Sequence, residues 1–138
     1  MGTGYVRQQD RGSTRLGVDF MMARELSVAQ NQVGDVLVFE LSGPVDAMTM
    51  ETFEGALGPV FRSRDARAVV DLSKLTYICS HAMGTLIEYH RQCCLGNGKI
   101  VIACSNKSVL KSFERLKADA VLTIVPDRDR AVATIQAG

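Results

Sequence analysis

Residues 66–104, ARAVVDLSKLTYICSHAMGTLIEYHRQCCLGNGKIVIAC, contain two strand patterns on either side of a helix pattern. The apolar segments Ala66–Leu72 and Lys99–Cys104 each predict a buried strand. The segment between them repeats side chains at the spacing of one helix face: Met83, Leu86, Ile87, His90, Cys93 and Cys94. Because a strand, a helix and a strand in succession form a parallel pair with a right-handed crossover, this stretch predicts an α/β protein.

The predicted helix has recognisable ends. Ser80 stands immediately before the pattern, where a serine hydroxyl caps a helix and stabilises it by about 1 kcal/mol. Gly96-Asn97-Gly98 ends it. Ser80 also has a functional interpretation as a phosphorylation site, because a helix N-terminus offers unpaired N–H groups and favours negative charge. Every N-cap serine shares this property, so the residues alone leave both roles open.

The sequence before residue 66 predicts a strand pair and a helix. Leu26–Ala29 and Val36–Leu41 have strand composition, and a turn around Gly34 separates them, so we expect an antiparallel pair. Met50–Phe61 has helical spacing, in which Gly58-Pro59 predicts a kink or an early end.

The sequence after residue 104 continues the alternation. Ser108 is expected to cap a third helix, Val121–Val125 to form the last strand, and Pro126-Asp127 to start a short helix. The order is therefore β-β-α-β-α-β-α-β-α. It predicts a mixed, mostly parallel sheet with an antiparallel edge strand, flanked by about four helices.

Composition and charge narrow the class of protein. The chain has 138 residues, of which 46% are hydrophobic and 22% charged, as in one ordinary globular domain. Lys and Arg number 16 against 15 Asp and Glu, so no basic field predicts binding to nucleic acid or to an anionic membrane. The apolar stretches are too short to span a membrane and no secretion signal is evident, so we expect a cytoplasmic protein without membrane insertion.

The amino-terminal segment differs in composition from the rest. Residues 1–24 are expected to form a flexible arm, and residues 25–138 the folded domain. Within the arm, Leu16–Met22 is more apolar and could form an extra strand or a short docking element.

The sequence lacks the usual signatures of phosphate binding and hydrolysis, so no catalytic residues are predicted. His90 and Cys93 have a spacing that can converge on one metal ion, but His81 and His90 lie nine residues apart, which separates them by roughly 13 Å along a helix. We therefore predict no metal site and no cofactor. A nucleophilic Cys79 near a helix N-terminus is a further alternative, although no base is placed beside it.

Residues 26–137 resemble the STAS family, which contains the bacterial anti-sigma factor antagonists and their relatives. The element order and several local matches carry this resemblance. Gly43-Pro44-Val45-Asp46 looks like the family's Gly-x-x-Asp loop, and Val69–Ser73 looks like its central strand ending in Asp-Leu-Ser. Tyr77–Leu86 falls where the family has an apolar residue followed by Asp-Ser-Ser-Gly-Leu-Gly, and Gly98 fits the next turn.

The resemblance implies a regulatory binding protein rather than an enzyme. Family members of the antagonist kind bind an anti-sigma factor that is also a serine kinase, and phosphorylation of the first serine of the motif releases that partner. Ser80 matches the phosphorylated serine, Gly84 the second glycine, and Asp46 the loop aspartate. Cys79, His81 and Ala82 depart from the pattern, which removes an acid and a hydroxyl near Ser80.

These matches predict a partner-binding surface that comprises Gly43, Asp46, His81, Met83 and Gly84 around Ser80, with Met83 alternatively in the core. The expected partner is an anti-sigma factor with serine kinase activity, and a homodimer is a further expectation. The main alternative is a STAS scaffold or accessory subunit without a phosphoswitch, in a signalling assembly or a lipid-transport ATPase. A small-ligand or nucleotide sensor is a second alternative.

Overall fold

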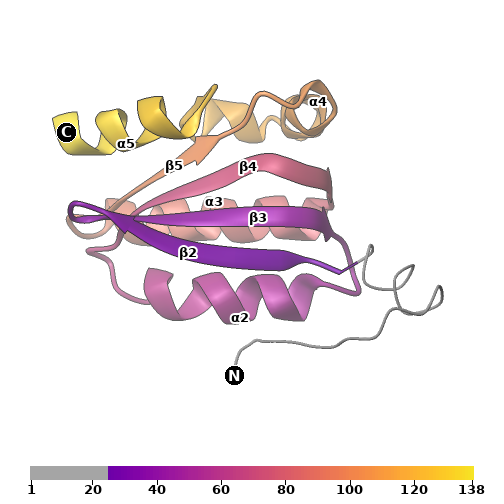
Figure 1. Cartoon of the computed structure of the whole chain (residues 1–138), viewed down its shortest axis with the longest axis horizontal. Coiled ribbons are helices and arrows are strands. Elements are labelled where there is room, and N and C mark those ends of the chain that lie inside the picture. The colour runs from indigo at the N-terminus through magenta and orange to yellow at the C-terminus, as the bar shows by residue number, and fades with distance from the viewer. Residues whose placement is uncertain (1–24) are drawn as a thin grey trace.

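A computed structural model describes residues 25–138, so the predicted arm over residues 1–24 lies outside the described residues (Figure 1). The elements follow in the order β2 (Ser27–Val33), β3 (Val36–Val45), α2 (Met50–Phe61), β4 (Arg67–Ile78), α3 (Ser80–Cys94), β5 (Lys99–Ala103), α4 (Lys107–Arg115), the 3-10 helix η1 (Ala118–Ala120), β6 (Ile124–Val125) and α5 (Arg128–Ala137). The predicted fold class is confirmed.

The strands form one sheet in the order β2-β3-β4-β5-β6. β2 pairs antiparallel with β3, from Ser27 opposite Ser42 to Val33 opposite Val36. The turn between them contains Gly34 at φ +62°, a left-handed conformation that favours glycine. The remaining pairs are parallel, because each next strand is reached through a helix.

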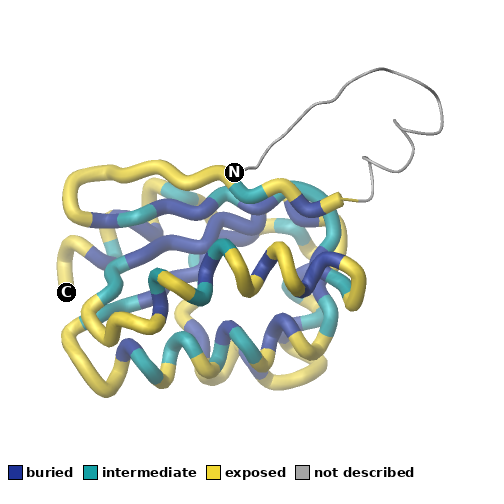
Figure 2. The backbone as a smooth tube through the Cα atoms, turned by 90° about the horizontal axis from the view of Figure 1, so that it is seen from below, coloured by how far each residue is buried: buried dark blue, intermediate teal, exposed yellow. Residues whose placement is uncertain are grey.

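The buried apolar side chains form two clusters, which lie between the sheet and the helices that cover it. α2 and α3 lie on one side and α5 on the other (Figure 1). Apolar side chains of α2, α3 and α4 join the larger cluster, and those of α5 join the smaller one. β2 is exposed along most of its length, whereas the strands behind it are largely buried (Figure 2).

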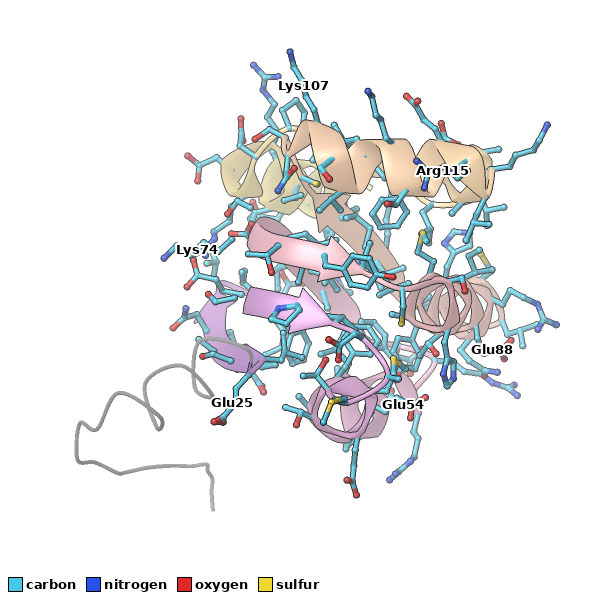
Figure 3. All side chains as sticks on the ribbon, turned by 90° about the vertical axis from the view of Figure 1, so that its right-hand side faces the viewer. Glu25, Glu54, Lys74, Glu88, Lys107 and Arg115 are labelled. Atoms are coloured by element: carbon cyan, nitrogen blue, oxygen red, sulfur yellow. The ribbon has the colours of Figure 1, made fainter. Side chains whose placement is uncertain are left out.

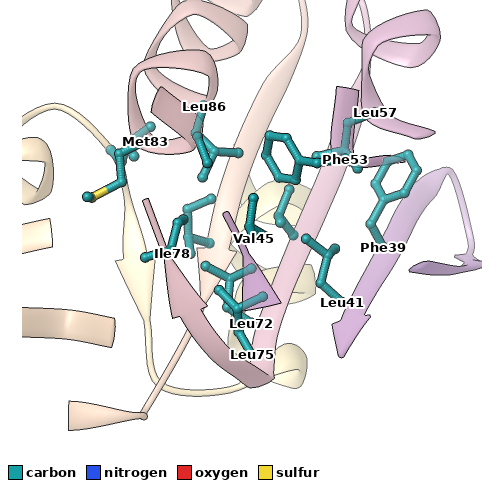
Figure 4. Packing of buried hydrophobic residues seen from close by; sticks show 14 of the residues in the cluster. Phe39, Leu41, Val45, Phe53, Leu57, Leu72, Leu75, Ile78, Met83 and Leu86 are labelled. Carbon is teal, nitrogen blue, oxygen red and sulfur yellow. The ribbon is translucent and has the colours of Figure 1, made fainter. Parts of the chain in front are cut away.

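The larger cluster connects the core to the ends of the central strands. Phe53 and Leu57 of α2 pack near Phe39 of β3 (Figure 4). Met83 of α3 lies near Ile78, the last residue of β4 (Figure 4). Packing of Met83 near the carboxyl end of β4 therefore positions the first turn of α3 at that edge of the sheet.

The strands differ in length from the prediction. β3 continues past Leu41 to Val45, and β4 continues past Leu72 to Ile78, through the segment predicted as a connection. The register of the β3–β4 pair shifts between Glu40 and Ser42 and between Gly43 and Pro44. These bulges allow β3 and β4 to stay paired up to Val45 and Ile78. The last strand is confined to Ile124–Val125, because only these residues pair with β5.

The predicted helix boundaries also need correction. α2 runs through Pro59 to Phe61, because proline removes only the N–H that would bond the Gly55 carbonyl, while Leu57 and Phe61 bury the last turn. Ser108 does not cap α4. Asn106 does, since its Oδ1 accepts hydrogen bonds from the backbone N–H groups of Ser108 at 2.9 Å and Val109 at 3.4 Å.

Candidate partner-binding site

The carboxyl ends of β3 and β4 lie side by side. Val45 pairs with Ile78, and the Cys79 N–H donates a hydrogen bond of 2.9 Å to the Val45 carbonyl. The loop that follows β3 and the first turn of α3, which follows β4, therefore share one edge of the sheet. Figure 3 views the molecule from this edge, toward which the arrowheads of both strands point in Figure 1.

Gly43 has a backbone role at this edge. Its φ is +100°, and a Cβ atom on it would lie 2.4 Å from the carbonyl oxygen of Glu25. Any other residue would be strained and would collide with the chain entering β2. Gly43 therefore shapes the edge without offering a side chain to a partner.

The carboxylate of Asp46 organises the loop between β3 and α2. Its Oδ1 accepts hydrogen bonds from the N–H groups of Met48 at 2.9 Å and Thr49 at 3.2 Å. The buried Thr49 hydroxyl in turn donates to the Pro44 carbonyl at 2.9 Å and accepts from the Asp46 N–H at 2.9 Å. This closed set of bonds leaves Met48 at the tip of the loop, with 88% of its surface exposed.

Ser80 is the first residue of α3 rather than its N-cap. The residue at the cap position is Cys79, whose side chain makes no capping bond, so the predicted capping role of Ser80 is wrong. The reason is that the helix begins one residue earlier than the apolar pattern indicates. Ser80 is exposed, and its hydroxyl makes no hydrogen bond with any residue from 25 to 138.

The next residues of α3 have different environments. His81 is exposed, and its Nε2 lies 3.8 Å from Glu54 Oε2 of α2. Met83 is 3% exposed and belongs to the core, so it supports the surface from beneath. Gly84 is exposed, and a Cβ atom on it would meet nothing within 4 Å, so packing does not require glycine there.

Two exposed apolar residues at this edge escaped the sequence prediction. Met48 lies in the Asp46 loop, and Tyr77, which pairs with Pro44 one position before the strand ends, is 53% exposed. Single apolar residues near a strand end look like core in the sequence. Their exposure could have been predicted only from the register of β3 and β4, which brings the two strand ends to one edge of the sheet.

The structure places one of the four cysteines, Cys79, at this edge. All four are free, and Cys79 is half-buried. Burial raises the pKa of the Cys93 thiol to about 11 and also raises the pKa of Cys104 above its ordinary value, so both stay protonated at neutral pH. Within residues 25–138 no three His, Cys, Asp or Glu side chains gather as metal ligands. None of the helices in this part of the chain has both the length and the apolar composition that a membrane span requires.

The chain is similar in fold to solved structures at low sequence identity. An anti-sigma factor antagonist from Mycobacterium paratuberculosis is 20% identical, with a TM-score of 0.73 over 80% of this chain and 94% of that one. A putative anti-sigma factor antagonist from Thermotoga maritima is 13% identical, with a TM-score of 0.70 over 79% and 94%. The Bacillus cell fate determinant SpoIIAA in its phosphorylated form is 13% identical, with a TM-score of 0.60 over 79% and 99%.

Comparison by sequence gives a family rather than a single relative. No curated protein matches the chain significantly. The STAS domain profile, however, matches residues 27–131, which include every described strand and the whole candidate site. The chain therefore belongs to the STAS domain family.

Proposed function

We propose that this chain is a regulatory protein of the anti-sigma factor antagonist type, which binds a kinase-type anti-sigma factor and is switched by phosphorylation of Ser80. The observation that carries the proposal is the placement of Ser80. It is exposed at the first residue of α3, and its hydroxyl is free of hydrogen bonds within the described chain. A kinase can reach such a hydroxyl without unfolding the domain.

The position also suits the product of the modification. The first backbone N–H groups of a helix lack partners within the helix, and the helix dipole favours negative charge at this end. A phosphate on Ser80 would therefore be tolerated by the fold. SpoIIAA, with which this chain shares its fold, has been solved in a phosphorylated form, which supports the compatibility of the fold with a phosphate.

The proposed partner surface surrounds Ser80 at the carboxyl edge of β3 and β4. It comprises the Gly43–Asp46 loop, the exposed His81 and Gly84, and the two apolar contacts Met48 and Tyr77. Exposed apolar side chains beside a polar loop suit a protein partner, because covering them removes apolar area from water. A phosphate at the centre of this surface would be buried against the partner without a counter-ion, which costs several kcal/mol of binding free energy.

A STAS scaffold without a phosphoswitch is the second candidate, and one observation favours it. The Asp46 carboxylate is occupied by the loop N–H groups, and Cys79 stands where an acid is expected beside the acceptor. Such a protein would use the same surface but would not be phosphorylated.

Phosphorylation by a candidate partner separates the two functions. The full chain is incubated with ATP and a kinase-type anti-sigma factor encoded beside it in the genome, and the modified residue is mapped by mass spectrometry. We expect one phosphate on the parent and none on Ser80→Ala, whereas Ser108→Ala, which alters an exposed serine at the start of α4, should be modified like the parent. Equal modification of parent and Ser80→Ala would contradict the switch.

A further inference from the structure

The carboxyl end of α3 carries a histidine and a cysteine that face each other. Cys94 Sγ lies 3.5 Å from His90 Nε2, one helical turn away. Cys94 is exposed and His90 is half-buried, so solvent reaches the pair. The sequence pattern placed Cys94 on the buried face, which is wrong. The His90–Cys93 spacing that the sequence analysis considered, before predicting no metal site, does not bring those two side chains together, since Cys93 turns inward with its Sγ 3.7 Å from the Ala66 carbonyl.

The separation of the two donor atoms matches the bite of a tetrahedral metal ion. Zn²⁺ bonds of about 2.3 Å to sulfur and about 2.0–2.1 Å to nitrogen, at a tetrahedral angle, hold the donors about 3.6 Å apart. The pair could therefore bind such an ion with little movement of either side chain.

The surroundings leave this pair available to a cation. Arg91, the residue after His90, is held by Glu88 at 2.6 Å, and Glu88 also accepts from Gln92 at 3.0 Å. Cys94 is the last residue of α3, where the helix dipole favours positive charge. The neighbouring Cys93 does not compete, because its side chain is buried with its Sγ 3.7 Å from the Ala66 carbonyl.

We propose that His90 and Cys94 form half of a Zn²⁺ site, which a second copy of this chain completes with the same two residues. Residues 25–138 of one chain supply two ligands here, since no group of three metal-binding side chains exists among them. A two-fold axis through the ion doubles the pair to Cys₂His₂, a set typical of closed zinc sites. The exposed Leu95, adjacent to Cys94 and 61% exposed, would be covered by the partner copy.

The site is independent of the proposed partner surface. Ser80 and Cys94 stand at opposite ends of α3, about 21 Å apart along the helix axis. Zn²⁺ binds the thiolate form of cysteine, so each chain releases the Cys94 thiol proton to solvent when the ion binds. Dimerisation through this end would leave the Ser80 edge of each copy free.

Cobalt and zinc titrations of the full chain, kept reduced with a phosphine reductant, test the proposal. Co²⁺ should give sulfur-to-cobalt charge-transfer absorption that saturates at half an equivalent per chain. Light scattering after size exclusion should show the mass doubling with Zn²⁺ and returning to that of one chain on adding chelator. Cys94→Ser and His90→Gln should lose both effects, while His81→Gln, which alters the other histidine, should keep them.

Three results would overturn the proposal. Saturation at one equivalent with the mass of a single chain would show that the site is not shared. Binding that survives in Cys94→Ser would place the metal elsewhere. A parent protein that binds Co²⁺ no more tightly than Cys94→Ser and His90→Gln, with circular dichroism showing all three folded, would show that the pair is not a metal site.

Discussion

Arg128, the first residue of α5, donates two hydrogen bonds to Asp71 Oδ2 of β4, from Nε at 3.0 Å and from Nη2 at 2.9 Å. The same Nη2 lies 2.8 Å from Glu40 Oε2 on the neighbouring strand β3. Asp71 is 4% exposed, so its charge has little access to water. One guanidinium thus fastens α5 to two central strands.

Removing this guanidinium should destabilise the domain. Arg128→Met leaves Asp71 buried without its counter-ion, and we expect the free energy of unfolding to fall by about 2–3 kcal/mol. The measurement is urea unfolding followed by circular dichroism. Arg130→Ala is the control, because its ion pair with Asp127 is exposed and 3.6 Å long, and it should change stability by less than about 0.5 kcal/mol. Equal losses in both variants would mean that the Asp71 contact contributes nothing specific.

The same contact should make stability depend on pH in the acid range. Burial alone would raise the pKa of Asp71, but hydrogen bonds from Ser73 and Arg128 outweigh it and hold the pKa below its ordinary value. A carboxyl group with a lowered folded-state pKa stabilises the protein above the unfolded-state pKa of about 3.9, and this stabilisation is lost as the pH falls through the folded-state value. Unfolding measured from pH 7 down to pH 2 should therefore show a steeper acid loss in the parent than in Asp71→Asn. Parallel curves would rule out this linkage.

Two glycines at the candidate site should respond in opposite directions to alanine. Gly43→Ala places a Cβ atom 2.4 Å from the Glu25 carbonyl oxygen at φ +100°, so we expect a loss of at least about 2 kcal/mol of stability. Gly84→Ala puts a methyl group into open space within a helix, so stability should rise by about 0.5–1 kcal/mol. Thermal unfolding of the two variants beside the parent measures both effects. A Gly43→Ala protein as stable as the parent would show that the chain near Glu25 can move aside.

The apolar residues at the edge should contribute to partner binding more than to folding. Met48→Ala and Tyr77→Ala alter side chains that are 88% and 53% exposed, so each should change stability by less than about 1 kcal/mol. We expect each to weaken binding of the anti-sigma factor about tenfold, as for contacts inside an interface. Calorimetric titration measures the affinity. Val33→Ala, at the opposite end of the sheet and 43% exposed, should leave it unchanged, and an equal loss there would exclude this surface as the interface.

The sequence predicted the element order because each strand and helix has its own hydrophobic period. It did not predict that β3 continues through Gly43-Pro44 to Val45, because the bulges that permit this depend on pairing with β4. The sequence placed Asp46 and Ser80 several residues beyond strands expected to end at Leu41 and Leu72. In the structure β3 and β4 continue to Val45 and Ile78, and their parallel register brings both residues to one edge. The contact between His90 and Cys94 is a local one between residues four apart on α3, but the exposure of Cys94 was missed because packing against the sheet decides which face of the helix is buried.

Substitution of Ser80 tests the proposed switch apart from stability. Because the Ser80 hydroxyl does not cap α3, Ser80→Ala should change stability by less than about 0.5 kcal/mol. Ser80→Asp places a carboxylate in the first turn, where the helix dipole stabilises it by about 0.3–1 kcal/mol, so the variant should fold at least as well as the parent. Urea unfolding of the three proteins checks this before any binding experiment.

Binding should separate the same three proteins. Ser80→Ala keeps the surface neutral and should bind the anti-sigma factor like the parent. Ser80→Asp buries an uncompensated charge in the interface and should bind at least about 100-fold more weakly, since several kcal/mol are lost. Ser63→Asp adds the same charge to an exposed serine between α2 and the start of β4, at the opposite edge of the sheet, and should bind normally. If Ser80→Asp binds as tightly as Ser80→Ala, a charge at this position does not control the interface, and the protein functions as a STAS scaffold without a phosphoswitch.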